Sequence, residues 1–410
     1  MGRNRPALLV FAACLAAMTA DVAFAQLPAD GSKKPEQTKQ PDPPPIAFFL
    51  AKGEADSCGA GCHEWIAADG TIDPAAAPRF RGFLQRHGKR RLPIYFHSPG
   101  GAVSAAIEIG RMLRARGMTA GVARTIPQGC DPRQAREAAC DALKRAGREL
   151  TAELRTVHTL CNSSCVYALI GAKIREVTAG ARIGVHALAL AQVDKNGQMK
   201  LRNRQELSRD DLAALKAGNG RLAQYIVAMG VDRGLFEAAA AIEHERLRYV
   251  SRDEIARFGI DAREFHESRW VVDEGARFVV VKFVTEARGN PKQYRTTKFE
   301  LSCGRAGDLV VAFSRELATS DKPASIAVTA RNGDFVLPPH RGKPILGYNN
   351  VEMEDRFARV PIAFFQDAAA GDVIEIMEAP DLAARDKPWR IRLATAGLKT
   401  AIEALAGRCR

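Results

Sequence analysis

Residues 91–123 of this 410-residue chain restrict its fold more than any other segment. Residues 91–96 are a short apolar run typical of a strand, Ser98-Pro99-Gly100-Gly101 predicts a turn, and residues 102–116 place apolar side chains at helical spacing. Residues 118–123 fit a second strand. A strand, turn, helix and strand within about 30 residues form a βαβ unit, which requires a parallel sheet with a right-handed crossover.

A second unit of the same kind follows along the chain. Residues 161–172 predict a turn and a helix, and residues 176–188 predict an extended segment that contains His186. Between the two units, residues 130–156 are charged and rich in Ala and Arg. They indicate a solvated helical insertion, with a basic contact surface as the alternative.

The pattern changes after residue 269. Alternating strands such as 278–284 and 308–313 replace the helical spacing, and a final helix is expected near residues 393–406. We therefore predict an α/β fold: a parallel-sheet domain over residues 46–268, followed by a smaller β-rich domain over residues 269–410.

The first 25 residues predict export. Two arginines precede an apolar run over residues 7–17, which is too short to span a membrane, and residues 23–25 (Ala-Phe-Ala) form a small-residue cleavage site. A lipoprotein site at Cys14 is the rival interpretation, but its flanking residues fit a lipobox poorly. We expect a signal peptide over residues 1–25, cleavage near Ala25, and a periplasmic mature protein.

Composition supports a soluble, basic protein carried on a tether. Residues 26–45 contain six Pro and no aromatic residue, so they predict a disordered linker. The chain has 60 Lys plus Arg against 47 Asp plus Glu, and removing residues 1–25 leaves 58 against 46, a formal charge of +12. An exported protein rarely meets nucleic acid, so we expect no nucleic-acid partner and a salt-sensitive association with an anionic envelope surface.

Eight of the nine cysteines remain after removal of the signal peptide, and their spacing suggests disulfide bonds. An even number in an exported chain favours disulfides, because an oxidising compartment lets them persist. Zinc is the competing interpretation, but the close cysteine gaps are three residues rather than the usual two, and the histidines are scattered. We therefore expect no metal, and the spacing suggests four candidate pairs while leaving the connectivity open: Cys58 with Cys62, Cys130 with Cys140, Cys161 with Cys165, and Cys303 with Cys409.

A serine nucleophile needs a sharp turn, a histidine base and backbone N–H donors for the oxyanion. Ser163 or Ser164 begins the predicted helix after residue 162, and His186 ends the next extended segment. The Gly100-Gly101 turn can present bare N–H groups because glycine has no Cβ.

These residues resemble the ClpP serine peptidases of the ClpP/crotonase fold. The likeness rests on the HSPGG turn between strand and helix, the serine at a later helix start, the Gly171-Ala172-Lys173 segment, and the histidine that ends residues 181–186. It covers roughly residues 46–265 and looks closest to an exported branch with paired cysteines around the serine. The resemblance implies Ser163 as nucleophile, His186 as base, and the N–H groups of Gly101 and Ser164 as the oxyanion hole. It also implies that Ser98-Pro99-Gly100-Gly101 aligns the substrate backbone as an added strand.

The chain departs from the family at two places. The segment from serine to histidine is about two residues short, which leaves Ser164 open as an alternative to Ser163. The family's acid aligns with Leu247, which cannot orient an imidazole. Glu243 and Glu245 are near in sequence but occupy other positions. A substitute carboxylate, a Ser–His dyad and an inactive site all remain open.

Two other residue types could be mistaken for catalytic groups. Either cysteine of the CNSSC segment could act as a thiolate, although oxidising conditions disfavour it. His97 precedes the turn, where the family has a strand end rather than a base. The other histidines have no metal-ligand spacing and are interpreted as non-ligands: residues 63, 87, 158, 244, 266 and 340.

The expected function is an exported serine hydrolase, first of all a peptidase. It would need no cofactor and no ATP-dependent unfoldase, because ATP is lacking outside the cytoplasm, so its substrates would be short peptides or unfolded proteins. An oligomer is possible by analogy with the family. The alternative is a catalytically inactive envelope binding or scaffold protein, and acyl-CoA chemistry is a weaker third reading.

Overall fold

The structure is a computed structural model that describes residues 44–409 with gaps at 89, 132–137, 194–198, 275–276, 306, 318–323, 332, 340–343, 348–350 and 380–387. The predicted signal peptide and all but the last two residues of the predicted linker lie outside this part of the chain. So do residues 132–137 of the charged insertion. Within the described residues, no helix is both long enough and apolar enough to cross a membrane.

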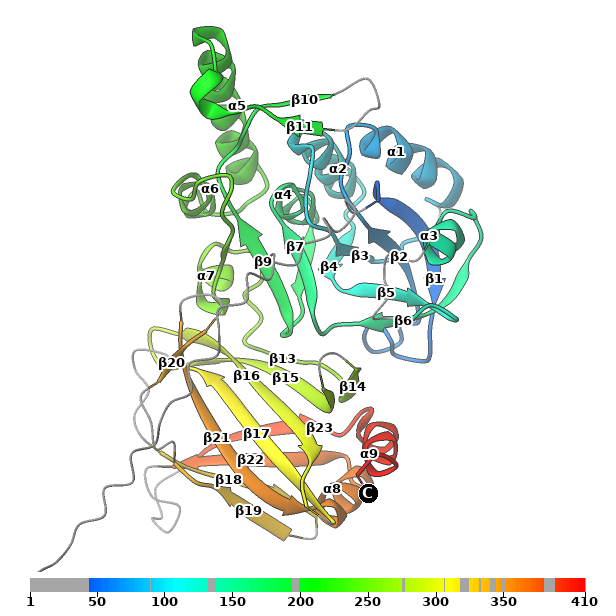
Figure 1. The fold of residues 1–410 in the computed structure, drawn as a ribbon, viewed down its shortest axis with the longest axis vertical. Coiled ribbons are helices and arrows are strands. Elements are labelled where there is room, and N and C mark those ends of the chain that lie inside the picture. The colour runs from blue at the N-terminus through cyan, green and yellow to red at the C-terminus, as the bar shows by residue number, and fades with distance from the viewer. Residues whose placement is uncertain are drawn as a thin grey trace, which may run out of the picture. The chain divides into compact units, whose positions relative to one another are not determined.

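The first sheet has seven strands and contains the predicted βαβ unit (Figure 1). The strand β3 (Ile94–His97), the helix α2 (Val103–Ala115) and the strand β4 (Thr119–Val122) follow each other, and β3 and β4 pair in parallel. The sheet order is β5-β6-β1-β2-β3-β4-β8, with further strands β1 (Ala47–Lys52), β2 (Glu64–Asp69), β5 (Arg124–Pro127), β6 (Leu150–Arg155) and β8 (Ile174–Val177).

A second, three-stranded sheet carries the predicted serine and histidine. Strands β7 (Thr159–Asn162) and β9 (Ala181–Val185) pair in parallel, and β12 (Arg248–Tyr249) runs antiparallel to β9. The fully buried helix α4 (Ser164–Ile170) follows β7 directly. Its side chains join the core formed under α1 (Ala76–His87) and α2.

Three helices and a small hairpin complete this part of the chain. The hairpin pairs β10 (Ala191–Val193) with β11 (Met199–Leu201) and leads through a 3-10 turn into α5 (Arg209–Ala228). Helices α6 (Gly234–Ala240) and α7 (Arg252–Arg257) follow. Ser208 and Ser251 each start their helix with a capping box, which satisfies backbone N–H groups that have no helical partner.

The rest of the chain is β-rich, as predicted. One sheet has the order β13-β15-β16-β17-β21-β20, with β14 also on β15, and a second has the order β19-β18-β22-β23. Helices α8 (Ile362–Ala369) and α9 (Leu398–Ala406) pack with both sheets around a separate apolar core. The strands are β13 (Phe265–Glu267), β14 (Val271–Glu274), β15 (Phe278–Arg288), β16 (Gln293–Cys303), β17 (Asp308–Glu316), β18 (Ser325–Ala330), β19 (Gly333–Leu337), β20 (Ile345–Leu346), β21 (Glu352–Pro361), β22 (Val373–Ala379) and β23 (Trp389–Ala394). An α/β fold with a parallel-containing sheet, followed by β-rich sheets, is therefore confirmed.

Three predictions about secondary structure and burial were wrong. Residues 150–155 form strand β6 rather than helix, because Leu150 and Ala152 face the core beside Trp65 while the alternate residues face solvent. The helical part of the charged insertion is α3 (Ala138–Lys144), and its Lys144 is buried against Asp69 at 2.5 Å rather than solvated. The final helix also starts later than predicted, at Leu398.

The structure joins all eight cysteines of its described part in the four expected pairs. Two bridges close short loops, at Cys58–Cys62 and Cys161–Cys165, with Cα atoms 5.0 and 5.2 Å apart. Cys130–Cys140 closes the base of the insertion. Cys303–Cys409 ties the end of β16 to the residues after α9, 106 positions further along the chain.

Candidate functional site

Three strand ends converge on the candidate site. The segment after β3 joins β7 because Ser98 N–H donates to Leu160 O and Asn162 N–H donates to Ser98 O, both at 3.0 Å. Beyond the end of β7, Ser163 N–H donates to Gly184 O of β9 at 2.7 Å. The Gly100-Gly101 turn, Ser163 and His186 each follow one of these strands, so the sheet brings them to one edge.

Ser163 has a strained backbone conformation. Its φ of 53° and ψ of −124° lie outside the regions that residues with a Cβ favour, and it connects β7 to α4 without capping the helix through its side chain. The disulfide between Cys161 and Cys165 spans this turn from both sides. Ser163 is half-buried, whereas Ser164 is fully buried and its Oγ has no hydrogen-bond partner among the described residues.

Both glycines of the turn are required by space and by conformation. A Cβ on Gly100 would lie 2.7 Å from the Cβ of Ser163, and one on Gly101 would lie 2.2 Å from Ile72 O. Their φ angles of 104° and 137° also disfavour other residues. Glycine at position 100 therefore allows the turn to approach the serine, and glycine at position 101 allows it to approach the backbone of Ile72.

Two backbone N–H groups beside the serine have no partner among the described residues, namely those of Gly101 and Ser164. The Ser164 N–H is the first of helix α4, where backbone donors are left unpaired and the helix dipole adds positive charge. Gly100 differs, because its N–H donates to Ser98 Oγ at 3.1 Å and its carbonyl accepts from Ile72. The backbone of Ser98 and Gly100 is thus already in use, which leaves Gly101 as the donor of this turn.

His186 is held in the tautomer that a general base needs. Its Nδ1 lies 2.9 Å from Ala187 O. A carbonyl only accepts, so Nδ1 carries the proton and Nε2 keeps a free lone pair. Burial lowers the pKa of His186, and the neighbouring His244 lowers it further, so the ring is neutral near pH 7.

His244 is the functional candidate that the sequence did not single out. Its Nδ1 also lies 2.9 Å from Ala187 O, and its ring meets that of His186 at 4.2 Å between centroids, edge to face. Ala187 N–H in turn donates to Ile242 O at 2.8 Å. In the sequence, the one feature that could have indicated this role is the position of His244, three residues before Leu247, which aligns with the family's acid.

The position aligned with the family's acid holds Leu247, and within the described residues no carboxylate hydrogen-bonds His186 in its place. Leu247 precedes β12 and lies against β9, where a Cβ on Gly184 would meet its Cδ2 at 2.8 Å. Glu243 and Glu245 are exposed, and neither hydrogen-bonds His186 within the described part of the chain. The imidazole therefore has a carbonyl where a triad has a carboxylate.

The remaining histidine near the turn is structural. Burial lowers the pKa of His97 to about 4, and its Nδ1 accepts a hydrogen bond from Leu160 N–H at 3.4 Å. No group of three or more His, Cys, Asp or Glu side chains in the described residues could hold a metal ion.

The comparisons with known proteins found weak structural likenesses. No protein-family model and no curated protein matches the sequence. The membrane-bound stomatin-specific protease 1510-N is 12% identical over 47% of this chain and 74% of its own, with a TM-score of 0.28. A ClpP1 variant from Listeria monocytogenes is 15% identical over 47% of this chain and 85% of its own, with a TM-score of 0.29. The ClpP catalytic domain from Plasmodium falciparum is 15% identical over 47% and 78%, with a TM-score of 0.26.

Proposed function

We propose that this chain is an exported serine peptidase that acts in the periplasm on short peptides or unfolded protein segments. Ser163 is its nucleophile, His186 its base, and the N–H groups of Gly101 and Ser164 its oxyanion donors. The observation that carries the proposal is the meeting of a strained, half-buried serine with two unpaired backbone donors at the ends of adjacent strands.

The proposed reaction follows from the protonation states. Ser163 Oγ attacks the substrate carbonyl and passes its proton to Nε2 of His186. The developing oxyanion accepts hydrogen bonds from Gly101 and Ser164. His186 then gives the proton to the leaving amine, and water repeats the sequence on the acyl-enzyme. Ala187 O keeps the imidazole oriented throughout.

A carbonyl stabilises the charged imidazolium less than a carboxylate does, because it carries only a partial negative charge. We therefore expect slow turnover compared with a Ser–His–Asp enzyme. The same observation favours the second candidate function, a binding or scaffold protein of the cell envelope that has lost the chemistry.

Labelling with a fluorophosphonate probe separates the two. The mature protein, the Ser163→Ala variant and the His186→Ala variant are exposed to the probe under oxidising conditions, with Ser164→Ala as the matched control. We expect covalent labelling in the wild type and in Ser164→Ala, and its loss in the other two variants. Cleavage of denatured casein, measured in the same four proteins, tests for peptidase rather than esterase activity.

Absence of labelling that depends on Ser163 would favour the binding protein. Labelling that persists in Ser163→Ala and disappears in Ser164→Ala would move the nucleophile by one residue and contradict the geometry proposed above.

A further inference from the structure

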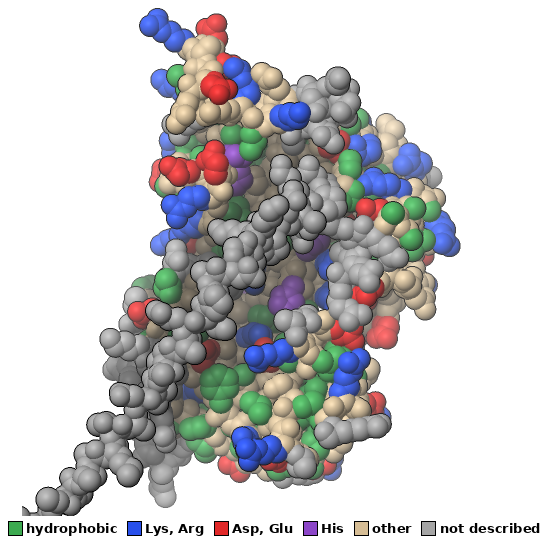
Figure 2. Space-filling model, viewed as in Figure 1, with side chains coloured by type: hydrophobic (Ala, Val, Ile, Leu, Met, Phe, Trp, Pro, Cys, Tyr) green, Lys and Arg blue, Asp and Glu red, His purple; other side chains and the backbone are tan. Residues whose placement is uncertain are grey.

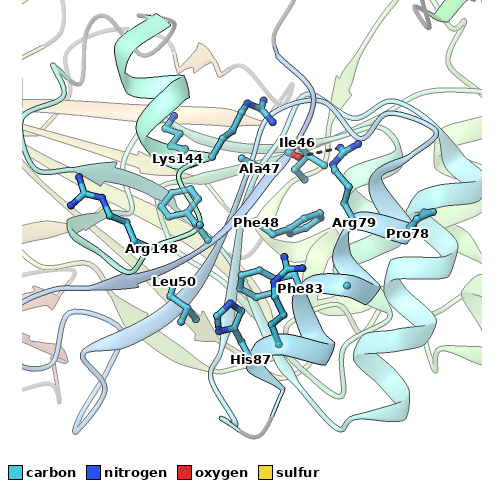
Figure 3. Close-up of a pocket in the computed structure, with 15 residues that line it drawn as sticks. Ile46, Ala47, Phe48, Leu50, Pro78, Arg79, Phe83, His87, Lys144 and Arg148 are labelled. Carbon is cyan, nitrogen blue, oxygen red and sulfur yellow. Dashed lines mark hydrogen bonds between the residues drawn. The ribbon is translucent and has the colours of Figure 1, made fainter.

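A cavity of about 580 Å³ lies away from the candidate site, between β1, α1 and the segment that follows α3 (Figure 3). None of the proposed catalytic or oxyanion residues lines it. Phe48, Leu50 and Phe83 give it an apolar wall, and Arg79, Lys144 and Arg148 give it a basic one.

The cavity runs along the edge of β1 rather than over one face of the sheet. Five consecutive residues, Ile46 to Leu50, line it. Consecutive strand residues point to opposite faces: Phe48 stacks on Phe80 of α1 with ring centroids 4.8 Å apart, whereas Phe49 belongs to the cluster on the other face. A cavity that touches all five must follow the edge.

Along residues 47–50, this edge has no neighbouring strand among the described residues. β1 pairs with β2 over its whole length, but with β6 only at Ala51 and Lys52. Within the described residues, the outer N–H and C=O groups of residues 47–50 therefore have no strand partner. At the start of the edge, a guanidinium group takes the place of a strand, because Arg145 donates to Pro45 O at 2.5 Å.

The lining carries positive charge without any acidic residue. Arg79 and Lys144 are neutralised by Asp73 and Asp69, respectively. Three more arginines of the lining have no carboxylate partner within the described residues: Arg86, Arg145 and Arg148. All three are exposed, and basic side chains are prominent over α1 on the face shown in Figure 2.

We propose that this cavity binds an acidic peptide segment in extended conformation, which adds to the outer edge of β1. Its backbone pairs with the N–H and C=O groups that every second residue of 47–50 directs away from β2, although Ala47, Phe49 and Leu50 are buried even without the peptide. Alternate apolar side chains of the peptide contact Phe48 and Phe83, and its carboxylates face Arg86 and Arg148. An anionic lipid would use the charge and the apolar wall but would leave the strand edge unpaired, so the open edge favours a peptide.

Gly82 of α1 provides a substitution that separates binding from folding. It lines the cavity, and a Cβ there would meet nothing closer than the guanidinium of Arg86 at 3.7 Å. A leucine at this mid-helical position therefore fits the fold, improves helix propensity and fills the cavity. Gly82→Ala improves propensity in the same way but leaves most of the cavity open, and serves as its control.

The binding experiment uses the mature chain and a fluorescein-labelled hexapeptide of alternating Glu and Val, with fluorescence anisotropy as readout. A peptide with Lys in place of Glu tests charge. Two analogues test strand addition. Each is N-methylated at every second residue, so that one analogue loses the N–H donors of one edge of the extended peptide and the other analogue loses those of the opposite edge. A double variant, Arg86→Glu with Arg148→Glu, reverses the charge of the cavity. Its control is the double variant Arg209→Glu with Lys216→Glu, which changes the net charge by the same amount on the exposed side of α5.

We expect the acidic peptide to bind, with a dissociation constant that rises with salt, and the Lys peptide not to bind. One of the two N-methylated analogues and the Gly82→Leu variant should lose binding. The Arg86→Glu, Arg148→Glu variant should bind about tenfold or more weakly, while the α5 variant and Gly82→Ala keep their affinity. Melting temperatures should not fall in Gly82→Leu.

Three results would overturn the proposal: no binding at millimolar peptide, equal binding of both N-methylated analogues, or equal binding by the Arg86→Glu, Arg148→Glu variant. Vesicles of phosphatidylglycerol that bind through the same residues, without peptide binding, would identify an anionic lipid instead. None of these readouts depends on Ser163, so the result is independent of the proposed peptidase activity.

Discussion

His186 and His244 share one acceptor: both direct Nδ1 at Ala187 O from 2.9 Å, and their rings meet edge to face at 4.2 Å. The pKa of His186 is lowered by burial first and then by the neighbouring His244. In the proposed mechanism this neighbour helps to keep His186 a base at lower pH.

The pH profile of Ser163 labelling tests this relationship. The pKa of His186 is lowered by burial and then by His244, so the labelling rate should fall only when the pH drops below the ordinary range for histidine. His244→Phe keeps a ring beside His186 and removes its charge, so the pKa of His186 should rise and the acidic limb should move to higher pH. The rate of fluorophosphonate labelling between pH 4 and 9 measures the shift.

His63→Phe is the control for this substitution, because His63 is exposed and lies outside the candidate site. Its profile should match the wild type. An unchanged acidic limb in His244→Phe would mean that His244 does not act on the base.

The glycine turn gives a second prediction, on geometry. Gly100→Ala places a Cβ 2.7 Å from both Asn162 O and Ser163 Cβ at a φ of 104°, so the turn must move away from the serine. We expect labelling of Ser163 to slow about 100-fold or more, because small displacements of reacting groups cost that much. Gly117→Ala is the matched control: its φ of 63° is also positive, but no atom lies within 4 Å of the added Cβ. It should cost roughly 1 kcal/mol of stability and leave the labelling rate unchanged. Equal labelling rates in the two variants would contradict the prediction that labelling of Ser163 requires the close approach of Gly100.

The parts of the fold that the sequence predicted well are those with a local pattern. The first βαβ unit followed from apolar spacing within residues 91–123. Three cysteine pairs followed from their short gaps, whereas Cys303 and Cys409 were paired only because they were the two cysteines left over. Strand β6 was missed because its alternation, with Leu150 and Ala152 inward, lies inside a charged stretch that resembles helix. His244 was missed because its contact with His186 depends on β12 holding the preceding turn against β9, which is a tertiary effect.

The two types of disulfide should separate stability from activity. Loop-closure entropy predicts that replacing Cys303 and Cys409 with Ala costs about 5 kcal/mol, since the bridge spans 106 residues, and that replacing Cys161 and Cys165 costs only about 2 kcal/mol for a separation of four. The effect on the labelling rate of Ser163 should have the opposite order. Loss of the Cys161–Cys165 bridge should slow labelling more than loss of Cys303–Cys409, because only the short bridge encloses the Ser163 turn. Urea unfolding followed by tryptophan fluorescence gives the free energies, and labelling below the unfolding transition gives the second readout. A short-bridge variant that labels as fast as the wild type would show that the bridge does not hold the nucleophile.

Asp261 should make the stability of the α/β part depend on pH under acid conditions. Burial alone would raise the pKa of Asp261, but the hydrogen bond from Arg263 and the charges of Arg252 and Arg263 lower it to about 2. A carboxyl with a lowered pKa stabilises the fold fully above its ordinary pKa of 3.8, and this contribution is lost as the pH falls toward 2. The shift corresponds to roughly 2 kcal/mol.

Asp261→Asn removes this dependence and leaves buried Arg252 without its carboxylate, so the variant should be less stable at pH 6 by at least that amount and show a flatter stability curve between pH 4 and 2. Exposed Asp334→Asn is the control and should follow the wild type. Chemical denaturation at a series of pH values measures both slopes. If Asp261→Asn leaves the slope of the wild type unchanged, the acid sensitivity belongs to other carboxylates. Glu378 is the next to replace, because burial would raise its pKa but the charges of Arg315 and Arg288 lower it to about 2.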